Sequence, residues 1–124
     1  MLNFTQIHIV ECDIRTASGK LYPKAVIEEA IKNIKEPVMG SFVNADITLD
    51  VTKITHKITN IKLIGNILIG DIQVLDTPYG VMLQQYITNN DTKFKLCLAG
   101  IGKLSEDNIV SEYQLNRIDV EMSQ

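Results

Sequence analysis

Apolar residues recur at two spacings along the chain, and both spacings occur between residues 75 and 102. Thr77 can cap a helix, and Pro78 fits the first helical position, where no backbone N–H is needed. The apolar positions that follow have the spacing of a single helix face: Met82, Leu83, Tyr86 and Ile87. We therefore predict a short amphipathic helix that stops at the Asn- and Asp-containing turn of residues 89–91.

A strand is predicted after this turn, because apolar residues alternate with other residues from Phe94 to Ala99. The side chains expected to point into the core are Phe94, Leu96 and Leu98. The side chains expected on the opposite face are Lys95, Cys97 and Ala99. That second face is therefore directed toward water, a site or a partner.

The rest of the chain predicts one more helix and further strands. The helix begins at Tyr22-Pro23-Lys24, with Pro23 at its first position, and is stopped by Pro37. Its apolar stripe comprises Val26, Ile27, Ala30, Ile31 and Ile34. The further strands are predicted over residues 4–14, 38–43, 54–64, 67–75, 109–115 and 117–122.

The clearest hairpin joins residues 54–64 to residues 67–75 through the two-residue turn Gly65-Asn66. The apolar residues change phase in the first arm, which indicates a bulge near residues 59–60. Residues 4–14 carry apolar side chains on both faces, which indicates a bulge or burial of both faces there.

Length and connectivity predict a single α+β domain over residues 1–124. The chain has 124 residues and a mass of 13.9 kDa, which is enough for one hydrophobic core. About seven strands with short connections favour an antiparallel sheet curled into a small β-barrel or sandwich, with two helices packed outside.

Charge and composition argue against several function classes. A net charge of −3 gives no support for nucleic-acid binding through bulk electrostatics. No window approaches the ~20 apolar residues of a membrane span, and the N-terminal residues lack signal-peptide features, so we expect a soluble intracellular protein. Cys12 and Cys97 are expected to be reduced thiols. No metal-site spacing or phosphate-binding loop is present, so neither a metal nor a cofactor is expected.

Several blocks of the chain, in this order, resemble the prohead proteases of tailed phages. These capsid maturation enzymes are serine proteases whose barrel fold is similar to that of the herpesvirus assemblin. The blocks are SGKLYPKAVIEEAI (18–31), PVMGSF (37–42), ITHKITNIKLIGNILIGDIQVLDTPYG (54–80), AGIG (99–102) and RIDVEM (117–122). The block that ends in LDTPYG and the hairpin before it are the most specific. The resemblance spans nearly the whole chain and implies the family's fold.

The residues at the family's catalytic positions differ in this chain. Where the family has the histidine of its G-E-L-x-H-P block, this chain has Asn44, whose carboxamide is not a base near neutral pH. Where the family has a serine pair and an arginine before G-x-G, the chain has Cys97-Leu98-Ala99. His56 matches the histidine of the family's S-H-x-I-T block. The chain is also short for this family.

Two interpretations of these residues remain open. A Cys97–His56 dyad, with the thiol as nucleophile and the imidazole as base, is the enzymatic alternative. In the other interpretation Cys97 is a small apolar strand residue, and His56 lies at the edge of the core with one hydrogen-bond partner. His8 has no partner motif around it. We predict the second interpretation and therefore expect no enzymatic activity.

The resemblance suggests a virion structural protein that has lost catalysis. We expect a capsid decoration or cement protein that binds the shell of major capsid protein as a homo-oligomer, a dimer or trimer, without nucleic acid or membrane. It is expected in the virion, after assembly in the host cytoplasm. The residues expected to contact the capsid are Asn44, Asp46, Lys93, Lys95 and Cys97, from the strand of residues 93–99 and the loop of residues 44–53. The alternatives are an active maturation protease that uses Cys97 with His56, and an internal scaffold or core protein.

Overall fold

A computed structural model describes residues 2–45, 51–89 and 93–123 of the chain. Its elements are β1 (Asn3–Glu11), α1 (Lys24–Lys32), β2 (Val38–Gly40), the 3₁₀ helix η1 (Val51–Lys53), β3 (His56–Ile64), β4 (Ile67–Val74), α2 (Pro78–Asn89), β5 (Lys93–Leu104) and β6 (Val110–Ser123). The predicted α+β class, with two α-helices, is confirmed.

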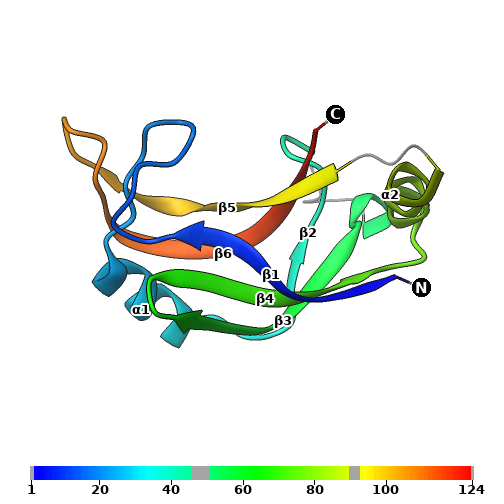
Figure 1. Cartoon of the computed structure of the whole chain (residues 1–124), viewed down its shortest axis with the longest axis horizontal. Helices are drawn as coiled ribbons and strands as arrows, with labels where there is room; N and C mark the ends of the chain where they lie inside the picture. The colour runs from blue at the N-terminus through cyan, green and yellow to red at the C-terminus, as the bar shows by residue number, and fades with distance from the viewer. Residues whose placement is uncertain (1, 46–50, 90–92, 124) are drawn as a thin grey trace.

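The strands form two antiparallel sheets (Figure 1). One has four strands in the order β1-β4-β3-β2, and the other is the long hairpin of β5 and β6. The hairpin lies over the four-stranded sheet, where β1 contacts β5 and β2 contacts β6. Within the described residues the two sheets do not close into a barrel. The core lies between them and includes Ile58, Leu68, Ile72, Leu96, Ile118 and Val120.

The expected number of about seven strands is wrong for the described part of the chain, which has six. The predicted strands 109–115 and 117–122 form the single strand β6. Ala99 pairs with Arg117 and Gly100 pairs with Leu115, so Asn116 is the extra residue of a bulge rather than a break. β5 also continues past Ala99 to Leu104, because the hairpin resumes its pairing after each register shift.

Both predicted helices are present, with one boundary corrected. Thr77 caps α2 as expected, because its Oγ1 accepts a hydrogen bond of 2.9 Å from the Gly80 N–H. α1 begins at Lys24, directly after Pro23, but it ends well before Pro37. The end is set by Asn33, whose side chain donates to the Glu29 carbonyl at 3.1 Å. A local side-chain bond, rather than the proline, terminates this helix.

The predicted hairpin and its bulge are confirmed. β3 and β4 pair with a register shift between Thr59 and Lys62, and Asn60 has a φ of 52°. The Glu36 carboxylate accepts the N–H groups of Asn60 and Ile61 at 2.7 and 3.0 Å. In a regular ladder these N–H groups would pair with the neighbouring strand. At the bulge the Glu36 carboxylate, which lies outside the sheet, accepts them instead.

A second carboxylate holds the predicted irregularity of β1. The register of β1 shifts between Phe4 and Ile7, and Gln6 has a φ of 52°. Asp71 on β4 accepts the Gln6 N–H at 2.9 Å and the Asn60 side-chain amide at 2.8 Å. These two hydrogen bonds to the charged form lower the pKa of Asp71.

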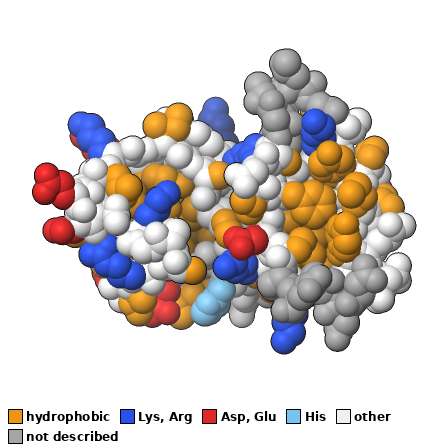
Figure 2. Space-filling view, turned by 90° about the horizontal axis from the view of Figure 1, so that it is seen from above, with side chains coloured by type: hydrophobic (Ala, Val, Ile, Leu, Met, Phe, Trp, Pro, Cys, Tyr) orange, Lys and Arg blue, Asp and Glu red, His pale blue; other side chains and the backbone are white. Residues whose placement is uncertain are grey.

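Some apolar side chains reach the surface. Figure 2 shows a broad area of them at the end of the molecule that carries α2. The exposed apolar residues of α2 are Val81, Met82 and Tyr86. In the described part of the chain, no helix is long and apolar enough to cross a membrane.

Candidate functional site

Cys97 lies midway along β5, on the face that the sequence predicts to be turned away from the core. Its neighbours Leu96 and Leu98 pack in or against the core, so the alternation is as expected. The thiol is half-buried and donates to Glu121 Oε2, with 3.5 Å between sulfur and oxygen. Lys95 forms an exposed ion pair with the other Glu121 oxygen at 3.8 Å. The three side chains therefore form one cross-strand cluster on the β5–β6 hairpin.

The surroundings of the Cys97 thiol favour its protonated form. Burial raises the pKa of Cys97, and the hydrogen bond and negative charge of Glu121 raise this pKa further. Lys95 lowers the pKa by less than these effects raise it. A nucleophilic cysteine needs the opposite environment, in which a cation or an imidazole stabilises the thiolate.

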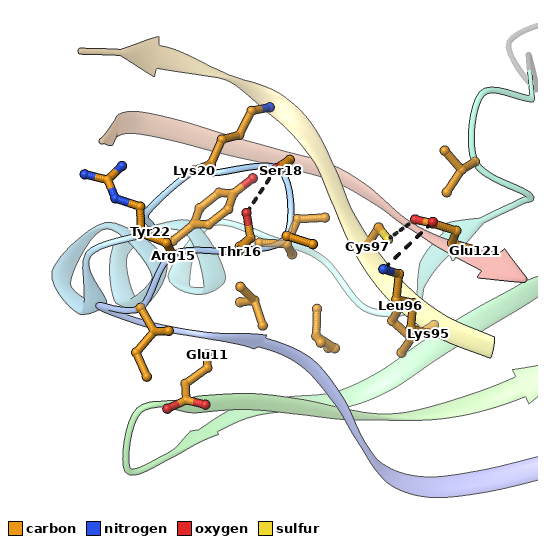
Figure 3. Close-up of a pocket in the computed structure, with 16 residues that line it drawn as sticks. Glu11, Arg15, Thr16, Ser18, Lys20, Tyr22, Lys95, Leu96, Cys97 and Glu121 are labelled. Atoms are coloured by element: carbon orange, nitrogen blue, oxygen red, sulfur yellow. Dashed lines mark hydrogen bonds and ion pairs between the residues drawn. The ribbon is translucent and has the colours of Figure 1, made fainter. Parts of the chain in front are cut away.

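A groove of about 690 Å³ runs past this cluster (Figure 3). Its walls come from the end of β1, the segment of residues 14–22, the middle of β5 and Val43. Lys95, Cys97 and Glu121 lie toward one end, as Figure 3 shows. Its lining includes apolar residues, such as Ile9 and Leu96, as well as charged and hydroxyl side chains.

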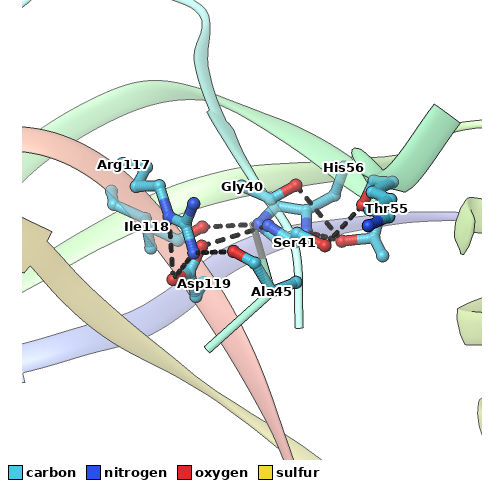
Figure 4. Close-up of polar contacts among 9 residues, drawn as sticks. Gly40, Ser41, Ala45, Thr55, His56, Arg117, Ile118 and Asp119 are labelled. Atoms are coloured by element: carbon cyan, nitrogen blue, oxygen red, sulfur yellow. Dashed lines mark hydrogen bonds and ion pairs between the residues drawn. The ribbon is translucent and has the colours of Figure 1, made fainter. Parts of the chain in front are cut away.

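His56 lies elsewhere, at the seam where β2, β3 and β6 meet (Figure 4). Its Nε2 lies 2.7 Å from the Ile118 carbonyl oxygen, and its Nδ1 is hydrogen-bonded to the Thr55 hydroxyl. A carbonyl only accepts, so Nε2 carries the proton and Nδ1 accepts from Thr55. Both ring nitrogens are thus occupied within the protein.

The prediction that His56 lies at the edge of the core with one partner is wrong. The side chain is fully buried and has two partners. Period-2 alternation identified the inward face but not the second sheet that covers it. Burial lowers the pKa of His56 from 6.5 to about 4, so the ring is neutral near neutral pH.

Glycine is required beside His56 because two chain segments touch there. A Cβ on Gly40 would lie 1.8 Å from the Ile118 carbonyl oxygen and 2.6 Å from His56 Nε2. The Gly40 carbonyl in turn accepts the Thr55 N–H at 3.0 Å. Direct backbone contact between β2 and β6 therefore depends on the missing side chain.

A buried carboxylate completes the seam. Asp119 is 4% exposed and accepts the Ser41 N–H at 3.1 Å through Oδ1. Its Oδ2 accepts Arg117 Nε and Nη2 at 3.0 and 2.9 Å. Arg117 Nη2 also donates to the Ala45 carbonyl at 2.9 Å, which attaches the loop after β2 to β6. Every charge here is paired, as burial requires.

The structure brings some of the predicted residues together and separates others. Cys97 and Lys95 line the groove together, next to Val43, the residue that precedes Asn44. Asn44 is exposed, with a φ of 70°, and Lys93 is exposed at the start of β5. Asp46 lies outside the described residues. No hydrogen bond joins Cys97 to His56, which both belong to the described part of the chain.

Sequence reasoning missed three charged residues of β6: Arg117, Asp119 and Glu121. They alternate along the strand and therefore share a face, and Asp119 is directly opposite Cys97 in the hairpin. The alternation of Arg117, Asp119 and Glu121 with Ile118, Val120 and Met122 was the available signal. Only the pairing register of β5 with β6, however, places Asp119 opposite Cys97.

The geometry around Cys97 does not activate its thiol as a nucleophile. The thiol faces a carboxylate, and the two ring nitrogens of His56 are engaged in the seam. Within residues 2–45, 51–89 and 93–123, no group of three or more His, Cys, Asp or Glu side chains could hold a metal ion.

Comparison with known proteins bears on the fold. No model of a protein family matches the chain, and no curated protein sequence matches it. Among solved structures, the chain is similar to the capsid assembly protease gp21 of bacteriophage T4, with a TM-score of 0.81 and 18% sequence identity. The similarity covers 100% of this chain and 92% of the protease chain. The protein therefore has the fold of a phage capsid assembly protease, as the resemblance to the prohead proteases predicts.

Proposed function

We propose that the protein is a non-catalytic component of a tailed-phage virion, which binds the shell of major capsid protein as a decoration or cement protein. The likeness in fold to a capsid assembly protease supports the link to capsids. A maturation protease must recognise the proteins of the shell. A related chain without the chemistry can keep that recognition and serve as a bound structural subunit.

One arrangement supports the absence of catalysis more than any other. Cys97 occupies the strand position where the resemblance places the family's serine, and its nearest polar partner is the Glu121 carboxylate at 3.5 Å. A carboxylate beside a thiol raises the pKa of the thiol and disfavours the nucleophilic thiolate. His56 has no free ring nitrogen with which to act as a base.

The groove beside Cys97 is the proposed contact surface for the capsid. Its lining combines apolar residues with charged and hydroxyl groups, a mixture that protein interfaces also have. Lys95 and Cys97 belong to this surface, and Asn44 follows the groove residue Val43. Lys93 is the first residue of β5, two positions before Lys95.

The test is co-sedimentation of purified protein with capsid shells that lack it. We expect binding in fixed proportion to the coat subunits. Lys95→Glu should weaken binding at least tenfold, because it reverses a charge on the groove and breaks the ion pair with Glu121. Lys103→Glu is the matched control, since it breaks an equivalent cross-strand pair with Glu112 at 2.6 Å outside the groove. Equal loss of binding in both variants would contradict the assignment of the groove.

The other candidate functions give different results. Cleavage of a capsid precursor by the purified protein, abolished in Cys97→Ala, would overturn the proposal in favour of an active protease. Presence of the protein in precursor particles and its absence from mature virions would instead identify an internal scaffold or core protein.

A further inference from the structure

The two sheets are joined on one side of the molecule and open on the other. On the joined side, the chain after β2 runs beside β6, where Phe42 forms a parallel bridge with Val120. On the open side, β1 and β5 are both edge strands, and among the described residues no ladder of hydrogen bonds joins them. The groove of Figure 3 lies along this open side, because residues 9–11 of β1 and residues 95–98 of β5 line it.

β1 and β5 run in the same direction. Strand direction alternates from β1 through β4 and β3 to β2, because each neighbouring pair is antiparallel. β6 runs parallel to the segment that follows β2, and β5 is antiparallel to β6. β5 therefore has the direction of β1. A single strand of the opposite direction, placed between these two edges, forms antiparallel pairs with both.

The backbone of β5 directs polar groups toward the open side. Val120 is the partner of Leu96 on β6. It donates its N–H to the Ser41 carbonyl at 2.8 Å, and its carbonyl accepts the Val43 N–H at 3.0 Å. Both backbone groups of Val120 thus point away from β5, so its pair with Leu96 is of the type without hydrogen bonds between the two residues. Leu96 therefore turns its own N–H and C=O away from β6, and Leu98 does the same, because the register does not shift between them.

These backbone groups lack a partner within the described chain. No hydrogen bond there satisfies the N–H or C=O of Leu96, although this residue is only 4% exposed. On the facing edge, the Cys12 N–H donates to the Asn66 carbonyl at 2.7 Å, so Glu11 next to it turns its backbone groups away from β4. Buried backbone groups are nearly always hydrogen-bonded, so these two edges call for the main chain of another segment.

We propose that an extended segment of the major capsid protein enters this opening as a strand antiparallel to both β1 and β5. The inference rests on the proposed function, which supplies the partner, and it adds the way in which that partner is bound. The inserted strand satisfies the backbone groups of both edges and closes the two sheets into one barrel. Main-chain hydrogen bonds of this kind supply affinity, and alternate side chains supply specificity.

The groove indicates which segment fits. Residues 95–98 of β5 line it, so about four residues of the segment, or roughly 13 Å of extended chain, lie along this edge. Every second residue of the segment faces the apolar side chains of Ile9 and Leu96 and is therefore apolar. Proline is excluded from the middle of the segment, because it cannot donate to a neighbouring strand.

Charge distinguishes the two ends of the groove. Arg15 and Lys20 line the end toward which β1 runs, together with the single carboxylate of Glu11. None of these three side chains forms an ion pair with a described residue. A strand antiparallel to β1 begins at this end, so the net positive charge favours an acidic residue near the start of the segment.

Hydrogen exchange with residue resolution tests the insertion. The purified protein is compared free and bound to capsid shells that lack it. We expect the amides of Leu96 and Leu98 to exchange at least tenfold more slowly in the bound protein, because they gain acceptors on the inserted strand. The Cys97 amide is the internal control, since its N–H points to β6 in both states and its exchange should not change.

Leu98→Pro tests the same donor by substitution. Proline removes the N–H that points to the open edge and leaves the ladder with β6 intact. Leu98→Ala is the matched control, because it removes the same side-chain contacts and keeps the N–H. Leu98→Pro should bind shells at least tenfold more weakly than Leu98→Ala, and circular dichroism confirms that both are folded. Equal binding of the two folded variants would overturn the proposal. If the proline variant does not fold, the exchange measurement on the wild-type protein decides.

The outcomes separate this inference from the proposed function. Shells that bind the protein without slowing exchange at Leu96 and Leu98 would overturn strand insertion and leave the decoration role standing. A protein that does not bind shells would contradict the proposed function and, with it, the coat protein as occupant. Slowed exchange in concentrated protein without shells would identify a second copy of the chain as the occupant and would also overturn the proposal.

Discussion

His56 Nε2 donates a hydrogen bond of 2.7 Å to the Ile118 carbonyl, and this bond joins the four-stranded sheet to the β5–β6 hairpin. The imidazole is therefore part of the structure that holds the two sheets together. Its position between two backbones explains why it is fully buried and why its proton is fixed on Nε2. Four consequences of this seam, of the bulge in β3 and of the groove that contains Cys97 can be measured.

Acid should destabilise the fold through His56. The pKa of its imidazole is about 4 in the folded chain, against an ordinary value of 6.5. Because the folded-state pKa is the lower one, the full stability is present above 6.5 and is lost as the pH falls toward 4. The free energy of unfolding should drop by about 3 kcal/mol over this window. Denaturant titrations across the window measure the drop, and His56→Gln should flatten it. Parallel curves for the two proteins would contradict the assignment to His56.

Gly40→Ala should destabilise the protein severely. The new Cβ would lie 1.8 Å from the Ile118 carbonyl oxygen, which belongs to backbone and cannot rotate away. We expect a loss of about 3 kcal/mol or more, at the upper end of the cost of overpacking. Gly65→Asn is the control, because the turn has open space and asparagine tolerates its φ of +61°. Thermal unfolding of both variants compares them directly, and similar melting temperatures would refute the proposed contact.

Glu36→Ala should weaken the β3–β4 hairpin. The substitution leaves the bulge N–H groups of Asn60 and Ile61 without their carboxylate acceptor. Because water can partly replace that acceptor at this exposed site, we expect a cost of about 1 kcal/mol. Hydrogen exchange at the two amides should accelerate. Glu29→Ala, in an exposed helical ion pair of 3.9 Å, should change neither stability nor exchange measurably.

Glu121→Gln should make Cys97 more reactive. The Glu121 carboxylate raises the pKa of the Cys97 thiol, so its removal should lower that pKa and increase the thiolate fraction at a given pH. The pH dependence of alkylation by iodoacetamide measures the change as a shift of the rate profile to lower pH. Cys12 is fully buried and should not contribute in the folded protein. Glu112→Gln leaves the thiol environment intact and should leave the profile unshifted.

Local features of the fold could be predicted from the sequence because local chemistry determines them. Thr77 accepts a backbone N–H of the first helical turn, and Pro78 has no N–H that needs a partner. Both effects are local, so they favour a helix start wherever the segment lies in the fold. The Gly65-Asn66 turn and the change of phase near Asn60 likewise follow from backbone geometry and strand period.

Features that depend on contact between distant segments could not be predicted in the same way. The pattern of residues 109–122 does not distinguish a bulge at Asn116 from a break, because the difference lies in the pairing with β5. The complete burial of His56 depends on the β5–β6 hairpin that covers it. Asp119 becomes important only because the fold places it opposite Cys97 and against Ser41. Of the groove residues, the sequence analysis thus named Lys95 and Cys97 as candidates but not Glu121.

The carboxylate beside Cys97 also determines what a serine at this position would meet. Exchange of Cys97 for serine would place a hydroxyl against Glu121, and His56 could not take its proton, because both ring nitrogens are committed to the seam. A histidine at the exposed position of Asn44 would supply a base but would leave the acidic neighbour in place. An exchange at position 97 alone would therefore not pair a hydroxyl nucleophile with His56.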